Sequence, residues 1–315
     1  MPQLAQDDAW PALPLEDWRQ TYQTLHLWTQ IVGKVRLALT PWLNHSWHTT
    51  LYVTPRGLST GPMSAGRRSL EVEFDFIGGA LQIRTDGPVM ALPLEFASIA
   101  DFHAALLSAL EAVGAPVRIH GAPSELPEAT PFHEDTAPRV YEAAKARRFF
   151  RVLAGVERVF GTFRTSFLGK SSPVHFFWGG FDLAVTRFSG RSAPRHPGGV
   201  PHLPDVVTRE AYSHEVSSAG FWPGGPGCEE AAFYSYAYPE PPGFRDTPVR
   251  PAAARYDPGL GEFLLPYEAV RSAGDPEATL MAFLRSTYEA AANTAGWDRA
   301  ALECPLGEPR RPRPI

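Results

Sequence analysis

The stretch GKSSPVHFFWGGFDLAVTRFSGRSAP (169–194) holds the densest group of residues that could do chemistry. It contains His175 and Asp182, and the later stretch REAYSHEVSSAGFWPGG (209–225) adds His214 and Glu215. Histidine titrates near neutrality, and a nearby carboxylate can fix its tautomer. We therefore expect these four residues to provide general acid–base catalysis.

Basic and aromatic side chains occur in the same segments. Together they predict a pocket for a small, anionic metabolite, because pockets combine an apolar wall with a few convergent polar groups. The residues expected to hold the anion are Lys170, Arg187 and Arg191, and those expected to shape the pocket are Trp178, Trp222 and Tyr236.

Other kinds of site have weaker support. The motif NHSWH supplies His45 and His48, but nothing has the regular spacing of a zinc-protease or cupin motif, so no metal site is predicted. No GxSxG motif occurs, and Cys228 and Cys304 lack a local catalytic signature. The sequence does not indicate a cofactor.

Composition narrows the class of protein. The 315 residues carry a formal net charge of −5 and no cluster of Lys and Arg interleaved with aromatics, which argues against a nucleic-acid partner. No apolar run approaches the roughly 18 residues that a membrane span needs, and the start lacks a secretory signal. We expect a cytoplasmic protein; the oligomeric state is left open.

Periodicity places helices and strands along the first half. Apolar residues at three- and four-residue steps predict a helix over 15–32 that Gly33 ends, followed by strands at 35–39 and 47–54. The stretch 70–85 alternates as a hairpin about Gly78-Gly79, with Phe74 facing Ile83 and Glu73 facing Arg84. A helix over 98–114 closes this half.

The second half repeats short words of the first. TQIVGK (29–34) returns as TSFLGK (165–170), and LPLE (92–95) as LPYE (265–268). With helices expected over 137–168 and 275–296, this favours an internal duplication. We predict an α+β fold of two similar halves, each an antiparallel sheet packed by a long first helix and a closing helix. The expected parts are 10–115, a linker 116–136, 137–304 and a disordered tail 305–315.

The duplication also bears on the site. If the halves pack about a pseudo-two-fold axis, Lys34 and Lys170 could face one cleft and bind an anion. Within the second half, Gly179-Gly180 suggests a bulge in one long strand that begins at Val174. Its alternation would put His175 and Arg187 on one face and Trp178 and Asp182 on the other. Three tyrosines share one face of the strand 231–241: Tyr234, Tyr236 and Tyr238.

Several long words resemble a bacterial family known only as a domain of unknown function. They are GKSSPVHFFWGGFDLAVTRFSGR, REAYSHEVSSAGFWPGG and FYSYAYPEP in the second half, with WTQIVGKVRLAL and NHSWH in the first. The resemblance covers roughly 10–305 and implies a bacterial cytoplasmic protein. It brings no activity, so no residue role follows from it.

Three functions remain open at this point. The first is an enzyme or binding protein for a small anionic metabolite, with its site on the second half or between the halves. The second is a non-catalytic scaffold that contacts a protein through the Pro/Gly-rich loops 192–205 and 223–230. The third is a metal-dependent hydrolase.

Overall fold

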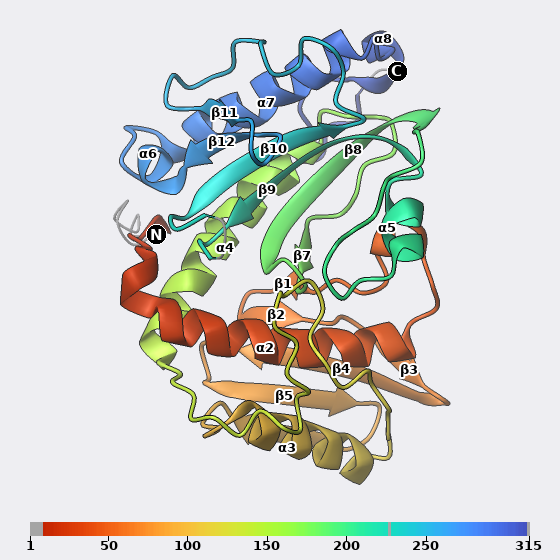
Figure 1. The fold of residues 1–315 in the computed structure, drawn as a ribbon, viewed down its shortest axis with the longest axis vertical. Coiled ribbons are helices and arrows are strands. Elements are labelled where there is room, and N and C mark those ends of the chain that lie inside the picture. Colours follow the sequence, from red (N-terminus) through yellow and green to blue (C-terminus); the bar gives the residue numbers. More distant parts are fainter. Residues whose placement is uncertain (1–8, 226–227, 314–315) are drawn as a thin grey trace.

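The fold is α+β, with two antiparallel sheets of six strands each. The computed structural model describes residues 9–225 and 228–313. Figure 1 shows one sheet beside α2 and α3, and the other backed by α4 and α7. In chain order the first half contains α2 (Leu15–Leu39), the 3₁₀ turn η1 (Asn44–Ser46), β1 (Tyr52–Val53), β2 (Gly57–Ser59), β3 (Met63–Ala65), β4 (Arg68–Asp75), β5 (Ala80–Thr85), β6 (Val89–Pro93) and α3 (Ile99–Ala112).

The second half follows the same broad order of helix, sheet and closing helices. It contains α4 (Ala143–Arg164), β7 (His175–Phe177), β8 (Asp182–Ser192), α5 (Asp205–Ala211), β9 (His214–Trp222), β10 (Ala232–Tyr238), β11 (Arg255–Asp257), β12 (Glu262–Pro266), α6 (Tyr267–Arg271), α7 (Pro276–Thr294) and α8 (Arg299–Leu302). The first sheet has the order β1-β2-β4-β5-β6 with β3 on β4, and the second β11-β12-β10-β9-β8-β7. This layout is compatible with two similar halves.

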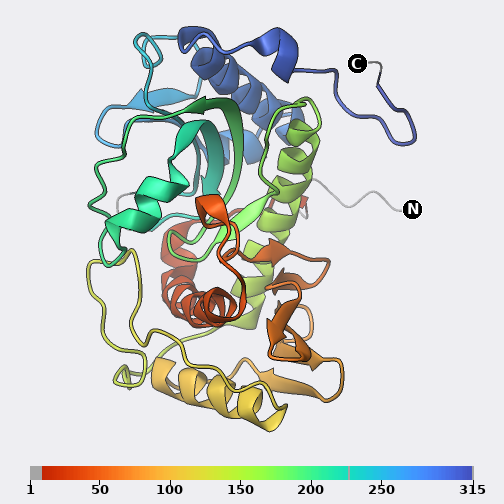
Figure 2. The same cartoon turned by 90° about the vertical axis from the view of Figure 1, so that its right-hand side faces the viewer.

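The two sheets meet where their first strands begin. Leu51 and Phe176 exchange two backbone hydrogen bonds of 2.9 Å each, which join the chain beside β1 to β7. Aromatic packing continues the contact, because Phe149 of α4 stacks on Trp18 of α2 at 4.9 Å and on Phe181 at 5.3 Å. One hydrophobic core therefore spans both halves. Figure 2 shows α4 running alongside both halves, with α2 seen nearly end-on.

Helix α2 runs through the glycine that was expected to end it. It continues to Leu39, so the predicted strand at 35–39 is wrong. Gly33 serves packing instead: a Cβ built there would lie 2.2 Å from the indole ring of Trp178. Because Val35 and its neighbours are buried against the rest of the protein, tertiary packing outweighs their strand-like pattern.

The repeated Gly-Lys words do not occupy equivalent positions. Lys34 lies inside α2, whereas Lys170 lies in the loop after α4, which ends at Arg164 rather than at 168. The Leu-Pro words do correspond in part, since Pro93 and Pro266 each end a strand. The argument that paired Lys34 and Lys170 in one cleft therefore fails, although the similar layout of the halves stands.

The pairing of β4 with β5 is shifted by two residues from the predicted register. Phe74 pairs with Leu81 and Val72 with Ile83, so residues 76–79 form a four-residue connection. The expected ion pair survives diagonally, with Arg84 Nη1 2.7 Å from Glu73 Oε2. A shift of two residues keeps every side chain on its face, which is why the alternation alone could not detect it.

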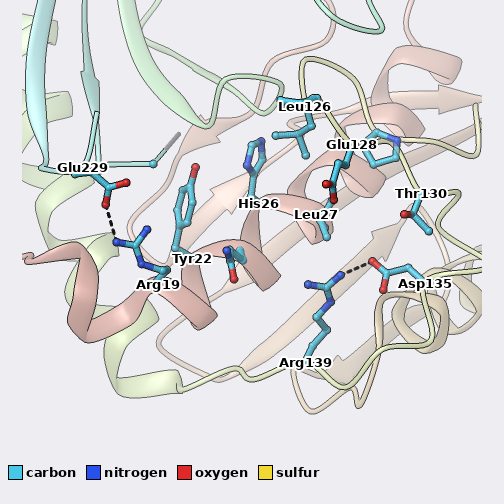
Figure 3. Close-up of a pocket in the computed structure, with 14 residues that line it drawn as sticks. Arg19, Tyr22, His26, Leu27, Leu126, Glu128, Thr130, Asp135, Arg139 and Glu229 are labelled. Atoms are coloured by element: carbon cyan, nitrogen blue, oxygen red, sulfur yellow. Dashed lines mark hydrogen bonds and ion pairs between the residues drawn. The ribbon is translucent and has the colours of Figure 1, made fainter. Parts of the chain in front are cut away.

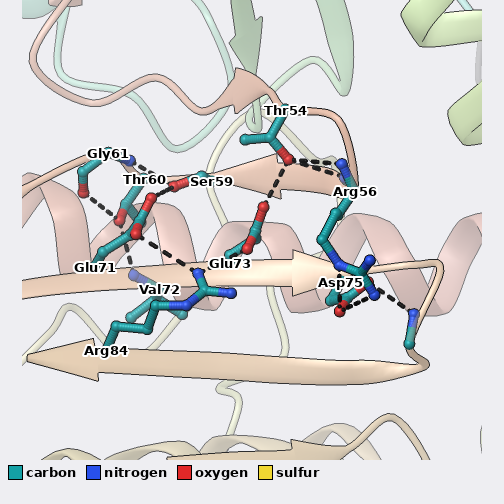
Figure 4. A network of polar contacts seen from close by, with 12 residues as sticks. Thr54, Arg56, Ser59, Thr60, Gly61, Glu71, Val72, Glu73, Asp75 and Arg84 are labelled. Atoms are coloured by element: carbon teal, nitrogen blue, oxygen red, sulfur yellow. Dashed lines mark hydrogen bonds and ion pairs between the residues drawn. The ribbon is translucent and has the colours of Figure 1, made fainter. Parts of the chain in front are cut away.

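Two carboxylates on this hairpin, Glu73 and Asp75, bond to neighbouring side chains. Glu73 also accepts a hydrogen bond from the Thr54 hydroxyl at 2.6 Å, and Asp75 accepts one from Arg56 Nε at 2.8 Å (Figure 4). Although burial opposes it, the Arg56 hydrogen bond and charge hold the pKa of Asp75 below its usual value. These buried acids are structural, because each has a cationic partner.

Gly179-Gly180 forms a hairpin turn rather than a bulge. His175 pairs with Ala184 and Phe177 with Asp182 across this turn. Residues paired across an antiparallel ladder share a face, so His175 lies on the face of Asp182 and opposite to Arg187. The predicted grouping of His175 with Arg187 is therefore wrong, because the chain reverses between them.

The two faces of the second sheet have different neighbours. Phe221 and Phe233 belong to the core face, which α4 and α7 cover. The opposite face carries polar and aromatic residues and forms the floor of a cavity. The closing helix α7 begins near its predicted start, where Asp275 caps it by accepting a 2.9 Å hydrogen bond from the Ala278 N–H.

No helix within residues 9–225 and 228–313 is long and apolar enough to cross a membrane. The predicted tail includes 314–315, which lie outside the described residues. Residues 305–313 form no helix, and the Arg313 guanidinium donates to the Thr165 carbonyl oxygen.

Candidate functional site

A cavity of about 330 Å³ lies on the uncovered face of the second sheet. Its floor is built from β8, β9, β10 and β12, and the segment that contains α5 borders it. Antiparallel pairing places the floor residues in rows, because alternate residues of each strand share this face. The floor residues are Asp182, Ala184, Thr186, Ser218, Trp222, Tyr234, Tyr236 and Glu262.

A glycine lets one tyrosine reach a carboxyl group two strands away. Gly220 stands between Ala184 and Tyr234 in one row of the sheet. The Tyr234 ring lies across it, since a Cβ on Gly220 would be 2.2 Å from the ring carbon that bears the hydroxyl. From there the Tyr234 hydroxyl donates to Asp182 Oδ2. Asp182 is only 8% exposed, so this hydrogen bond links two buried groups.

Glu262 supplies a second carboxyl group to the same floor. Ser235 of β10 pairs with Phe263 of β12. The adjacent residues of the two strands, Tyr236 and Glu262, therefore lie side by side, and both line the cavity. The Glu262 Oε2 atom is buried and has no hydrogen-bond partner among the described residues. The Tyr236 hydroxyl is 2.7 Å from that of Tyr212, which comes from the end of α5.

A third carboxyl group comes from the segment predicted to be only a linker. The Gln30 side chain of α2 bonds both backbone groups of Ser124 at 2.8 Å, and Lys34 Nζ lies 2.8 Å from Ser124 Oγ. These bonds fix the next residue, Glu125, at φ +63° beside the cavity. A Cβ on Gly179 would lie 1.9 Å from Glu125 Oε1, so that glycine makes room for the carboxyl group.

Burial shifts the acidity of all three groups. Burial raises the pKa of Asp182 to about 7, with the Tyr234 hydrogen bond opposing and the Glu125 charge adding to the rise. Burial, together with the charge of Asp182, raises the pKa of Glu262 to about 8. The Glu125 side chain is exposed to solvent on one side, but protein surrounds the rest of it. This partial burial raises the pKa of Glu125, and the positive charge of Lys34 opposes the rise. Carboxyl groups that titrate near neutrality are suited to proton transfer.

Backbone strain gathers at this cavity. Six non-glycine residues in the described part of the chain have positive φ, and three of them, His45, Ser46 and Glu125, line the cavity. A fourth, Phe181, immediately precedes Asp182. Each such conformation costs roughly 1–3 kcal/mol and tends to persist where function requires it.

One end of the cavity holds a histidine–lysine contact. His45 Nδ1 donates to the Ala211 carbonyl oxygen at 2.5 Å, so its Nε2 accepts from the Lys170 ammonium at 2.7 Å. Lys170 Nζ also lies 5.0 Å from the centre of the Trp47 ring and 4.8 Å from that of Phe188. Lys170 is therefore bound by protein groups at the cavity's end and does not line it.

Three of the predicted site residues lie in the cavity: Asp182, Trp222 and Tyr236. Sequence reasoning missed Glu125, because its position depends on the contacts of Gln30 and Lys34 with the linker. It also missed Glu262, because a charged residue in a strand is ordinarily expected to face solvent. The shared face predicted for the three tyrosines of 231–241 was a usable signal: Tyr234 and Tyr236 line the cavity, whereas Tyr238 donates to the Pro194 carbonyl oxygen.

His175 is buried away from the cavity. It is 1% exposed, packs edge-on against Trp47 and Tyr52, and has no hydrogen-bond partner for either ring nitrogen among the described residues. Burial, with the charges of Arg36 and Arg164, lowers the pKa of His175 to about 3. It forms no hydrogen bond with Asp182, so the structure does not assemble the expected base–carboxylate pair.

His214 and Glu215 lie at the start of β9, outside the cavity. His214 Nδ1 is 3.0 Å from Ser213 Oγ. Glu215 Oε2 is 2.7 Å from Arg191 Nη2, and Arg191 also donates to the Ala295 carbonyl oxygen at the end of α7. Glu215 and Arg191 therefore bond to each other and to a helix terminus.

Two other predicted ligand-binding residues are part of the core. Arg187 faces α4, where it donates to the Phe163 carbonyl oxygen and lies 3.5 Å from the Phe163 ring centre. Trp178 is 7% exposed, donates to the Thr49 carbonyl oxygen at 2.7 Å, and lies 5.3 Å below Lys34 Nζ. Lys34 contributes indirectly, by anchoring Ser124.

Two further hollows adjoin the cavity. The nearer, about 210 Å³, shares Glu125, Gly180 and Trp222 with it and includes His26. The farther, about 480 Å³, shares His26 with the nearer one and lies between α2 and the linker (Figure 3). His26 Nε2 lies 2.8 Å from the Gly179 carbonyl oxygen. The three hollows thus follow one another along the side of the molecule that the linker crosses.

Metal binding has no support within residues 9–225 and 228–313. No group of three or more His, Cys, Asp or Glu side chains there is placed to hold a metal ion.

The family model for a family of unknown function, DUF5996, matches residues 10–304. The chain belongs to this DUF5996 family. The resemblance seen in the sequence is confirmed over nearly the whole chain. No curated protein and no solved structure matches it.

Proposed function

We propose that the protein binds a small molecule in the cavity on the second sheet, with Asp182 and Glu262 as the groups that bond it and exchange protons with it. The observation that carries this is the placement of two carboxyl groups, Asp182 and Glu262, in one open, aromatic-walled cavity, where burial raises the pKa of both. They contrast with Glu73 and Asp75 of the first sheet, which arginines neutralise.

The volume supports a metabolite-sized ligand. Small-molecule sites commonly enclose about 300–1,000 Å³ and combine aromatic walls with few polar groups. Here Trp222 and Tyr236 supply aromatic surface, and Thr186 and Ser218 share a 2.9 Å hydrogen bond on the floor.

A thermal-unfolding screen with small metabolites tests the proposal. A ligand at about 100 times its dissociation constant adds about 2.7 kcal/mol, which raises the midpoint by several degrees. The shift should disappear in Ala184→Phe, which places a ring over the floor, and persist in Glu111→Gln, an exposed position on α3. A shift that survives Ala184→Phe would place the ligand elsewhere.

A second candidate function is recognition of a protein partner. Trp42 and Val206 are 56% and 69% exposed, and Trp42 Nε1 lies 3.2 Å from Glu210 Oε2 of α5. This apolar surface differs from the predicted one: in loop 192–205, Val200 and Leu203 line the cavity. In loop 223–230, residues 226–227 lie outside the described part. Pull-down with a Trp42→Ala control tests this candidate.

A further inference from the structure

The lining of the cavity is acidic. Glu125, Asp182 and Glu262 contribute carboxyl groups, and no lysine or arginine is among the lining residues that the structure describes. The cations expected to hold an anion are bonded elsewhere, Arg187 to the carbonyl oxygen of Phe163 and Arg191 to Glu215. The nearest lysines, Lys34 and Lys170, lie outside the lining and are bonded to Ser124 and His45. An anion entering here would therefore face carboxyl groups with no cation among the described lining residues.

The carboxyl groups keep acceptors available for a ligand. Asp182 is about nine-tenths buried at the cavity floor, and only its Oδ2 receives a hydrogen bond from another described residue. Glu262 Oε2 is buried and has no hydrogen-bond partner in the part of the chain that the structure describes. A buried acceptor without a donor costs free energy, and a donor-bearing cationic ligand would remove that cost.

Aromatic rings surround the same space. The Trp222 and Tyr234 rings are 4.5 Å apart between centroids, and the Tyr234 and Tyr236 rings stack at 6.2 Å. Phe177 and Phe188 also line the cavity. The faces of aromatic rings attract cations, and several rings combined with carboxylates are the recognised environment of bound ammonium groups.

We propose that the ligand of this cavity is a small organic cation, held by its positively charged nitrogen between Asp182 and Glu262 and against the rings of Trp222, Tyr234 and Tyr236. This rests on the proposed function and names its ligand class. The ionised carboxylates bind the cation, so binding releases the protons that burial retains on them. A longer substituent would extend past Glu125 toward the adjoining hollow.

The test compares ligands of one shape and different charge. Choline and 1,4-diaminobutane are titrated calorimetrically at pH 8.5 against their neutral counterparts, 3,3-dimethylbutan-1-ol and butane-1,4-diol, and against succinate. We expect at least one cation to bind and its neutral counterpart to bind at least about tenfold more weakly. Asp182→Asn with Glu262→Gln should weaken the cation at least about tenfold, while Glu111→Gln should leave it unchanged.

The remaining outcomes separate the two proposals. If a neutral compound or succinate binds as tightly as the cations and Ala184→Phe abolishes that binding, the cavity is a ligand site and the cation assignment is overturned. If no compound binds the folded protein, or if binding survives Ala184→Phe, the proposed function and the cation assignment both fail.

Discussion

Tyr234 donates its hydroxyl hydrogen to Asp182 by lying across Gly220, the residue between their strands. Asp182 is on β8 and Tyr234 on β10, so the contact spans the strand that separates them. Such a reach is available only where the intervening residue lacks a side chain. The glycine therefore sets the geometry of the cavity floor.

Replacing Gly220 should disrupt this contact. In Gly220→Ala the new methyl group would lie 2.2 Å from the Tyr234 ring, so the ring must move off Asp182. We expect a loss of about 1–3 kcal/mol in the free energy of unfolding, as for an overpacked core site. Denaturant titration measures the loss. Tyr234→Phe, which removes only the hydroxyl, is the control for the hydrogen bond, and a Gly220→Ala protein as stable as wild type would contradict the account.

Neutralising Asp182 should stabilise the protein at alkaline pH. The folded state holds the proton of Asp182 up to a pKa of about 7, above the model-compound value of 3.8, so wild-type stability falls as pH rises through this window. Asp182→Asn removes that loss. We expect it to raise the free energy of unfolding by about 1–3 kcal/mol at pH 8.5 and to change it little at pH 4.

Asp75, a buried acid bonded to Arg56, is the control for the effect expected at Asp182. Asp75→Asn removes a carboxylate whose pKa the Arg56 hydrogen bond lowers despite its burial, so it should destabilise the protein at pH 8.5. If Asp182→Asn destabilised at pH 8.5 as Asp75→Asn does, the raised pKa of Asp182 would be refuted.

His175 should make the fold sensitive to acid. Burial, with the charges of Arg36 and Arg164, lowers the pKa of His175 in the folded state from 6.5 to about 3. The unfolded chain therefore binds a proton that the folded protein does not, and the free energy of unfolding falls as pH drops from 6.5 toward 3. His175→Phe should gain about 2 kcal/mol at pH 4.5 relative to its effect at pH 8. Urea titrations at both pH values measure this, with the exposed His120→Phe as control. Equal effects at the two pH values would show that His175 is not held neutral by burial.

Two glycines inside helices should respond in opposite directions. A Cβ at Gly33 of α2 would collide with the Trp178 ring, whereas the nearest atom to a Cβ at Gly161 of α4 is 3.7 Å away. Gly161→Ala should therefore stabilise by about 0.5–1 kcal/mol through helix propensity. Gly33→Ala should destabilise by about 1–3 kcal/mol, as overpacking does. Thermal melts of both variants compare them, and stabilisation by Gly33→Ala would mean that Trp178 packs elsewhere.

The sequence predicted the elements better than their connections. The α+β class and the closing helix expected over 275–296 were predicted from patterns among near neighbours, and α7 spans Pro276–Thr294. Gly33 and Gly179 looked like chain breakers, but one accommodates Trp178 inside a helix and the other forms a turn against Glu125. Those roles are set by residues far away in the chain, which periodicity does not report.

The candidate site was likewise predictable only in part from the sequence. Asp182, Trp222 and Tyr236, which line the cavity, were predicted because ionisable and aromatic residues gather in these segments, as they do in pockets. Glu125 was missed because its position in a loop rests on bonds from Gln30 and Lys34 to Ser124. The arginines were misplaced for a related reason: Arg187 follows the pattern of its strand onto the core face, where ring contacts and a carbonyl oxygen hold it.

The most direct test is the titration of the Asp182 and Glu262 carboxyl carbons by ¹³C NMR, without and with whichever of choline and 1,4-diaminobutane binds more tightly. The account predicts midpoints near 7 for Asp182 and near 8 for Glu262 in the free protein, and lower midpoints for both when that cation is bound. Midpoints near the ordinary value of about 4 for both groups, unchanged by the cation, would contradict it.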